Sequence, residues 1–539
     1  MSRSHARGRW LSVPLIVAAF AMVLTMGGLG VMGAPRDDEV IVAFDKEPDT
    51  LNPYATRTLS AKELNVVEGF AVTNDKMQHV PRIIQRVPSL TNAGLTMTAG
   101  KMTVTWRLQP NLKWSDGKPV TSADAEFTYK TMMDPKFIVD SRAGWPVIES
   151  VKTPDPLTVV VTFKEHYAAY RDLFRYLLPK HILEGKDLNT YSEYNRSPVT
   201  TAPFVVQQWV PGQFLTTIAN PHYRDAAKGL PYFKKMTWRF VPDANTRINM
   251  LRAGEAHIAW AVPFDQIKPL QANSRLKVIV HPLNAWMHFD FNLRKPIFQD
   301  VRLRQAVAYA IDKEAIVSQV LGGLGKAAGP PITPLSWAHN PNAYSQYKFD
   351  VARARQLVAE AGWRPGPDGV LQKDGRPFTF DNCHNIGDAT QERVQQVIQA
   401  MLRQVGMNME IRNFSATAYG AIRARGECDT LFHRWIVPAT PLLSVFYAAD
   451  AVPPNGLNQV FYLNAEITEI IKDAEGTVDQ PRAKALFWRA QEILARDLPT
   501  IPIYYMVAAQ ATTARLSGLV GNPTNDGDGW NSEVWKLGP

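Results

Sequence analysis

The sequence predicts an α/β protein with at least two lobes, and two observations carry this prediction. The chain has 539 residues, far more than the about 250–300 at which one hydrophobic core stops growing. Helical and strand patterns alternate along it: a one-sided apolar stripe over residues 390–404 is followed by the strand-like MNMEIR. No internal repeat or low-complexity tract is visible by eye in this alternation.

The first 33 residues have the pattern of a secretory signal peptide. A basic start, an apolar stretch and small cleavage-site residues follow in order, as Arg3, Arg7 and Arg9, then residues 11–29, then Val31 and Gly33. An uncleaved membrane anchor is the alternative, because the apolar stretch is longer than a minimal one. The glycines within the stretch favour cleavage, so we expect residues 1–33 to be removed from an exported protein.

The positions of the two cysteines and the net charge further restrict the class of protein. Cys383 and Cys428 both lie far from the signal segment, so there is no lipobox cysteine and we expect a soluble periplasmic protein. The net charge of +9 is mild for this length, and the basic residues are scattered among acids rather than interleaved with aromatics. A solvated surface explains this distribution, and we expect no nucleic-acid partner.

Cys383 and Cys428 also raise two chemical hypotheses. They fall in the strand-like segments FTFDNC and CDTLFHRW, and in an oxidising compartment they could form one disulfide or stay unpaired. A metal site would need His384, His433 or Asp388 in addition, and the spacing of these residues matches no metal motif. We therefore expect no metal and no cofactor.

In the first half of the chain, the elements follow from local patterns. Residues 40–44 form an apolar strand that the prolines at 48 and 53 bring to an end. Residues 103–108 alternate polar and apolar side chains, as a half-buried strand does. Thr121 and Asp124 have the spacing of a capping box and open a helix, so turn and cap chemistry explains this aspartate better than catalysis does.

The second half is organised by aspartates that precede apolar stripes. Asp300 is the expected N-cap of a helix with apolar residues at 303, 307, 310 and 311, and Asp312 is the expected cap of a second helix that ends at Gly322 and Gly323. Two further aspartates, Asp243 and Asp350, are the expected caps of helices that end at Gly254 and Gly362, respectively.

Several of these segments resemble one known family. FNLRKPIFQDVRLRQAVAYAIDKEAIV at 291–317 and WSDGKPVTSAD at 114–124 closely resemble segments of the large periplasmic binding proteins of ABC importers, called solute-binding protein family 5. The resemblance covers nearly all of residues 40–539. It implies a two-lobed periplasmic binding protein fold of the large, class C type, with an extra subdomain inserted in the N-terminal lobe.

The resemblance also implies domain boundaries. Residues 34–80, 200–289 and 506–539 are expected to form lobe I, residues 81–199 its inserted subdomain, and residues 290–505 lobe II. The chain would cross between the lobes twice, near residues 288–291 and near residues 504–506. Two such crossings form a hinge.

The function that the resemblance implies is the periplasmic substrate-binding component of an ABC importer. Such a protein, expected to be a monomer, binds a peptide or peptide-like solute in the interlobe cleft by hinge closure and delivers it to the membrane permease. The alternatives are a binding protein for an opine, an oligosaccharide or a metal chelate, and a sensor that docks on a chemoreceptor or sensor kinase. The motifs G-x-S-x-G and H-E-x-x-H and a Walker loop are absent, so we expect no enzyme.

Cleft residues are also assigned through the resemblance. Trp435 matches a family tryptophan that lines the cleft. In peptide-binding relatives, an aspartate shortly after this tryptophan pairs with the ligand's α-ammonium. Residues 436–441 of this chain read IVPATP and contain no acid. Thr201 lies where relatives have a glycine-rich turn. The remaining expected cleft residues are Trp286, Tyr54 and Arg434. The alternatives are that Trp286 packs in the core, that Tyr54 packs on the surface and that Arg434 faces solvent.

Overall fold

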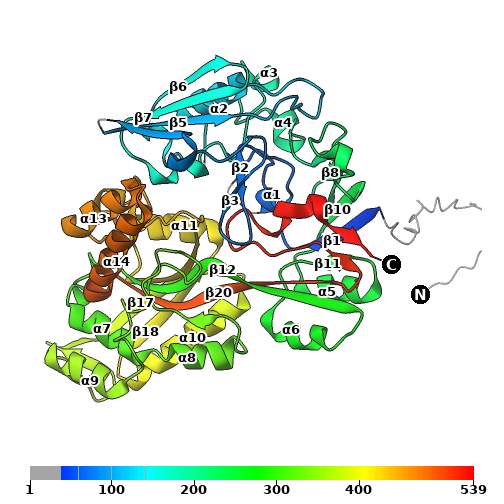
Figure 1. Ribbon diagram of the computed structural model, residues 1–539. Coiled ribbons are helices and arrows are strands. Elements are labelled where there is room, and N and C mark those ends of the chain that lie inside the picture. Colours follow the sequence, from blue (N-terminus) through cyan, green and yellow to red (C-terminus); the bar gives the residue numbers. More distant parts are fainter. Residues whose placement is uncertain (1–37, 57, 59, 99, 140, 539) are drawn as a thin grey trace, which may run out of the picture. The chain divides into compact units, whose positions relative to one another are not determined.

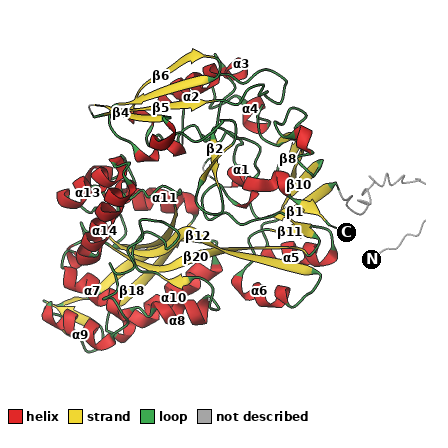
Figure 2. Cartoon of the chain, in the orientation of Figure 1, coloured by secondary structure: helices red, strands yellow, loops and turns green. Residues whose placement is uncertain are grey.

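A mixed sheet of eleven strands forms the centre of the computed structural model, which describes residues 38–538 apart from residues 57, 59, 99 and 140. The expected signal peptide therefore lies outside the described residues. Helices pack on the faces of this sheet (Figure 2). The strand order is β18 (Asn408–Phe414), β17 (Thr379–Asn385), β19 (Thr430–Ile436), β12 (Leu276–Phe291), β20 (Thr500–Thr513), β11 (Ile258–Ala259), β1 (Glu39–Phe44), β10 (Lys235–Phe240), β9 (Phe214–Ala219) and β8 (Phe204–Val210), with β13 (Lys326–Ala327) beside β20.

Two long strands, β12 and β20, link the two halves of the sheet (Figure 1). The first half of β12, residues 276–282, pairs with residues 507–513 of β20, and β20 then pairs with β11. After an irregularity between Pro282 and Trp286, the second half of β12 lies between β20 and β19. Both parts of the sheet therefore share the same pair of strands.

A second, four-stranded sheet lies within residues 95–163. Its order is β4 (Leu95–Thr98), β5 (Lys101–Arg107), β7 (Thr158–Phe163) and β6 (Ile148–Asp155). The helix α2 (Ser122–Met133) packs against β6 and β7. Three small sheets complete the strands: β2 (Ala71–Thr73) with β3 (His79–Pro81), β14 (Arg364–Pro365) with β15 (Leu371–Lys373) and β16 (Arg376–Pro377), and β21 (Leu516–Ser517) with β22 (Lys536–Leu537).

The remaining helices follow the alternating pattern that the sequence predicts. They are α1 (Ser60–Glu63), α3 (Lys180–Leu183), α4 (Ser192–Arg196), α5 (Ala244–Ala253), α6 (Phe264–Gln271), α7 (Val301–Ala310), α8 (Lys313–Ala315), α9 (Val351–Glu360), α10 (Ala389–Gln404), α11 (Ala416–Arg425), α12 (Ser444–Tyr447), α13 (Ala465–Gly476) and α14 (Gln480–Asp497). The mixture of sheet and helix confirms the predicted α/β class.

Three large hydrophobic cores are drawn from different parts of the chain. The first takes its buried side chains from residues 286–505, and the second from residues 70–194. The third combines residues 40–66, 204–260 and 516–535. A chain of this length thus divides its apolar burial among several cores, as its size requires.

The predicted helix caps are confirmed by the hydrogen bonds. Asp300 accepts a bond from the N–H of Arg302 at 2.9 Å, and Asp243 accepts one from the N–H of Thr246 at 2.7 Å. Asp312 caps α8 as expected, but α8 is short and continues as a π-helical segment, residues 316–320. Gly322 and Gly323 then end it at φ values of +63° and +81°, which glycine adopts at low cost.

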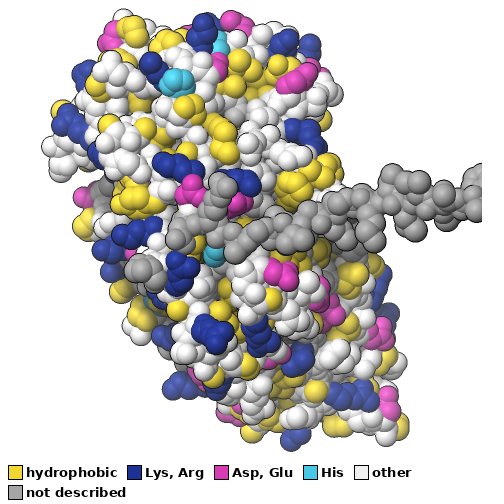
Figure 3. Space-filling model, turned by 90° about the vertical axis from the view of Figure 1, so that its right-hand side faces the viewer, with side chains coloured by type: hydrophobic (Ala, Val, Ile, Leu, Met, Phe, Trp, Pro, Cys, Tyr) yellow, Lys and Arg dark blue, Asp and Glu magenta, His cyan; other side chains and the backbone are white. Residues whose placement is uncertain are grey.

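The described part of the chain contains no helix that is both long and apolar enough to cross a bilayer. On the face drawn in Figure 3, Lys and Arg side chains are interspersed with Asp and Glu side chains. That distribution is typical of a solvated surface.

Candidate functional site

Trp435 lies at the centre of an aromatic cluster on β19. The strands β12 and β19 pair so that Trp286 lies directly opposite Trp435. Trp435 is half-buried, and its ring packs 4.6 Å from that of Phe446 on α12, whereas Trp286 is only 1% exposed. The structure therefore brings these two tryptophans together on neighbouring strands, with Trp435 half-buried and Trp286 in the core.

A buried histidine–aspartate network supports this cluster from below. Asp290 lies 2.8 Å from Nδ1 of His288 and 2.9 Å from Nε2 of His433, and the ring of His433 lies 4.7 Å from that of Trp435. Burial alone would raise the pKa of Asp290, but the two histidines outweigh it and hold this pKa well below its usual value. Burial lowers the pKa of His433 to about 3, with a smaller effect of His288.

Arg423 on α11 covers the other side of Trp435. Its guanidinium lies 5.4 Å from the centroid of the Trp435 ring and 5.5 Å from that of Tyr419, and Nη1 is 3.4 Å from Nδ1 of His433. Its Nε is buried without a hydrogen-bond partner. Burial lowers the pKa of Arg423, and the opposing effects of Tyr419 and Asp290 are smaller. Arg423 was not predicted as a site residue, because it lies in an ordinary helical segment.

The other predicted cleft residues lie in different surroundings. Arg434 is exposed, and its nearest acid is Asp388 at 3.9 Å, so it points away from the neighbouring Trp435 as alternation along a strand requires. Tyr54 donates a hydrogen bond to the carbonyl of Tyr176 at 2.7 Å and lies edge-on to Trp145.

Thr201 is the fifth predicted cleft residue. It is 4% exposed, and its hydroxyl lies beside the carboxylate of Glu68. The structure thus places a buried hydroxyl next to a buried carboxylate at this position.

A cavity of about 880 Å³ lies between two parts of the molecule that belong to different hydrophobic cores. One wall includes Glu165, His166 and Tyr167, next to β7, and the other includes residues 444–456 and 472–482, on and around α12 and α13. Both polar and apolar side chains line it. Its volume falls within the range of about 300–1,000 Å³ of small-molecule and cofactor sites.

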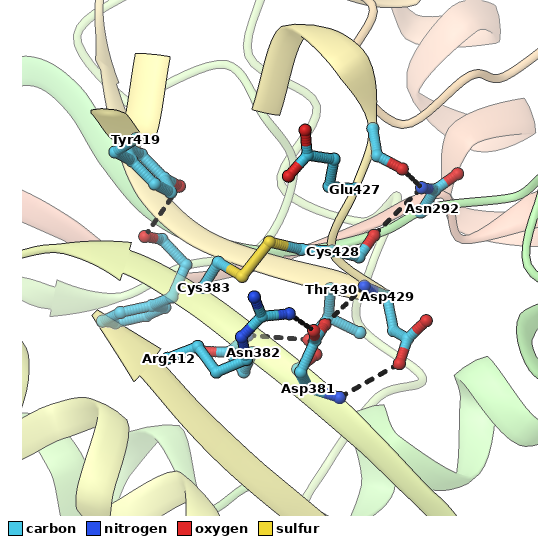
Figure 4. The surroundings of a disulfide bond; sticks show 12 residues. Asn292, Asp381, Asn382, Cys383, Arg412, Tyr419, Glu427, Cys428, Asp429 and Thr430 are labelled. Carbon is cyan, nitrogen blue, oxygen red and sulfur yellow. Dashed lines mark hydrogen bonds and ion pairs between the residues drawn. A yellow bond between two sulfur atoms is a disulfide. The ribbon is translucent and has the colours of Figure 1, made fainter. Parts of the chain in front are cut away.

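Cys383 and Cys428 form a disulfide, which settles the alternative left open by the sequence (Figure 4). The bond joins β17 to the segment before β19, with the two Cα atoms 6.2 Å apart. Beside it, the carboxylate of Asp381 accepts a hydrogen bond from the N–H of Asp429 at 2.6 Å.

Two groups of three possible metal ligands occur among the described residues. In the group of Asp381, Cys383 and Cys428, the two cysteines form the disulfide, and an oxidised cysteine offers no thiolate to a metal ion. In the other group, His288, Asp290 and His433 already bond to one another in the core. Neither group includes Asp388, which instead caps α10 through bonds from the N–H groups of Thr390 and Gln391.

Comparisons with known proteins agree with this geometry. A family described as "Bacterial extracellular solute-binding proteins, family 5 Middle" matches residues 85–453. The chain is 28% identical over 524 residues to the oligopeptide-binding protein AppA of Bacillus subtilis, covering 94% of this chain and 93% of AppA. It is 26% identical over 499 residues to the glutathione-binding protein GsiB of Salmonella typhi, covering 89% of this chain and 91% of GsiB.

Solved structures give the same fold. The structure of AppA from Bacillus subtilis in complex with a nonapeptide matches with a TM-score of 0.79 and 26% identity, covering 93% of this chain and 99% of AppA. That of NikZ from Campylobacter jejuni in complex with Ni(L-His) matches with a TM-score of 0.80 at 22% identity, covering 93% of this chain and 100% of NikZ.

The fold and the sequence match define a two-lobed extracellular binding protein. The chain belongs to family 5 of the bacterial extracellular solute-binding proteins. The family resemblance predicted from residues 114–124 and 291–317 is therefore confirmed.

Proposed function

We propose that this protein binds a peptide or peptide-like solute in the cavity between its two walls and delivers it to the permease of an ABC importer. The observation that carries the proposal is the cavity of about 880 Å³, whose walls come from separate hydrophobic cores. Full-length similarity to relatives named for oligopeptide and glutathione binding supports a peptide-like ligand.

The mechanism we propose is hinge closure. Lobe I would comprise residues 34–80, 200–289 and 506–539, with the subdomain 81–199 inserted, and lobe II residues 290–505. The shared strands β12 and β20 would serve as the hinge, with the irregularity between Pro282 and Trp286 as the site of bending. A solute that touches both walls stabilises the closed form by the difference between its affinities for the closed and open forms.

None of the five predicted cleft residues lines the cavity itself. Trp435 is the proposed aromatic contact for a part of the ligand that extends beyond the cavity, because it packs on Phe446 of α12, whose Ser444 and Val445 line one wall. Trp286 would fix the position of Trp435 from the core, and Tyr54, Thr201 and Arg434 remain proposed contacts of lower rank because of the surroundings described above. The protein would act in the periplasm as a monomer after removal of residues 1–33.

A thermal-shift screen of residues 34–539 tests the proposal. Peptides of two to nine residues, glutathione, chelated nickel, opines and oligosaccharides are added separately, and a ligand present at about 100 times its Kd adds about 2.7 kcal/mol to the stability. A rise in melting temperature with peptides supports the proposal. Shifts with non-peptide solutes alone would replace it by the corresponding non-peptide transport function.

A further inference from the structure

The cavity wall that belongs to the second hydrophobic core carries an apolar face. Met97 on β4, Val147 just before β6 and Tyr167 shortly after β7 all line the cavity and pack against that core. Each of the three is only half-buried, so apolar surface is left uncovered along this wall. Glu165 shares the wall but is exposed to solvent, where a charge interacts weakly with a ligand.

Tyr167 is held in place from behind. Its ring stacks on that of Phe163, with 6.0 Å between centroids and 23° between planes. Its phenolic oxygen occupies space beside Gly144, where a Cβ atom would overlap it. Gly144 itself has a φ of +80°, which glycine adopts at low cost. The ring is therefore fixed before a ligand arrives, and contact with a ligand costs it little conformational freedom.

The opposite wall meets this apolar face at Val478. Val478 lies between α13 and α14, lines the cavity and packs against the second core, although its neighbours in the chain belong to the other wall. Two residues earlier, a Cβ atom on Gly476 would lie only 3.2 Å from the carbonyl oxygen of His166. The absence of a side chain at Gly476 thus allows the two walls to approach closely beside Tyr167.

Most charged groups of the opposite wall already have protein partners. Asp450 is paired with Lys472 at 2.7 Å. Asp473 is paired with Arg482 at 3.0 Å. The oxygens of Glu475 accept hydrogen bonds from the start of α12. These groups gain little from a ligand because their bonds are already made, so discrimination between solutes is expected at the apolar face.

We propose that Met97, Val147, Tyr167 and Val478 form a subsite for one large apolar side chain of the solute, aromatic or branched aliphatic. This inference rests on the proposed function and gives the chemical class of the solute: a peptide or peptide-like molecule that carries such a side chain. Covering the uncovered apolar surface supplies the free energy of recognition. Because Val478 belongs to the opposite wall, the bound side chain contacts both walls and stabilises the closed form.

The experiment compares Tyr167→Ala, which removes the ring, with Tyr167→Phe, which keeps it. The matched control is Tyr191→Ala, which removes a half-buried tyrosine that packs against the same core but does not line the cavity. Met97→Gln is the second test variant, because it makes the apolar face more polar at nearly constant side-chain length and decides alone if Tyr167→Ala does not fold. Melting curves without peptide verify the folding of each variant.

The probe is a pool of peptides of two to nine residues built from glycine, alanine and serine. Half of the peptides carry one phenylalanine or leucine at any position, and the other half carry one glutamine. The pool is equilibrated with each protein by dialysis, and the retained peptides are identified by mass spectrometry. The ratio of retained apolar to retained glutamine peptides measures the selectivity of the subsite.

The wild type should retain the phenylalanine and leucine peptides about 10- to 100-fold more strongly than the glutamine peptides. Tyr167→Ala and Met97→Gln should lose most of this preference, whereas Tyr167→Phe and Tyr191→Ala should keep it. Equal retention of both halves by the wild type, or an unchanged preference in the two test variants, overturns the subsite and leaves the peptide function standing. If no peptide is retained and only non-peptide solutes raise the melting temperature, both proposals are overturned.

Discussion

The ring of Trp435 packs against the ring of Phe446, with 4.6 Å between centroids and 33° between planes. Because Phe446 lies on α12, this contact ties the central sheet to the wall that carries the cavity. The position of the indole is therefore fixed by its neighbours, as a preorganised binding surface requires.

Trp435→Ala should weaken ligand binding by about 10- to 100-fold, because a large aromatic anchor contributes most to binding when its position is fixed. The control is Trp337→Ala, which removes a more exposed tryptophan that packs on Phe487. Calorimetric titration of both variants measures the effect. An unchanged affinity in Trp435→Ala would remove this residue from the site.

Acid should destabilise the folded protein through His433 and Asp290. The pKa of His433 is lowered in the folded state, so the unfolded chain binds the proton first and stability falls from about pH 6.5 downward. Asp290 has a depressed pKa and adds a further loss below about pH 4. Each group contributes up to about 1.4 kcal/mol per pH unit.

Urea unfolding at a series of pH values measures this dependence. His433→Gln should reduce the slope between pH 6.5 and 4, because the residue no longer titrates differently in the folded and unfolded states. A slope identical to that of the wild type would mean that other groups cause the acid sensitivity.

Reduction of the disulfide should lower the free energy of unfolding by about 2–4 kcal/mol, since the cysteines close a loop with a sequence separation of 45. Urea unfolding with and without dithiothreitol measures the loss. The variant in which Cys383 and Cys428 are both alanine should be less stable than the oxidised wild type and insensitive to the reductant. Free thiols in the unfolded, unreduced protein would contradict the bond.

The parts of the fold that depend on neighbouring residues could be predicted from the sequence. Caps such as Asp300 and Asp243 need only a side chain within three residues of the N–H groups that they serve, and both were predicted. The second helix of this region was predicted as one element, but the structure divides it into α8 and a π-helical segment. Periodicity alone does not distinguish these helical types.

The candidate site depended on long-range contacts that no local pattern reveals. Trp435 could be proposed because it follows a recognisable segment, whereas Arg423 and the cavity residue Glu475 come from two different helices in ordinary sequence surroundings. The disulfide could be predicted only in part. Both cysteines were placed in strand segments of one lobe, but their adjacency depended on strand order, which puts β17 beside β19.

The position of β20 has a consequence for the order in which the molecule can assemble during synthesis. Residues 500–513 lie between β12 and β11, so the sheet that begins with β1, near the start of the described chain, stays open until almost the last residues have been made. The two parts of this sheet cannot be joined through β20 while residues 500–513 are missing. A nascent polypeptide of this kind can form the contiguous second core, residues 70–194, early, but its complete central sheet waits for the last long strand, because that strand pairs with segments made long before it.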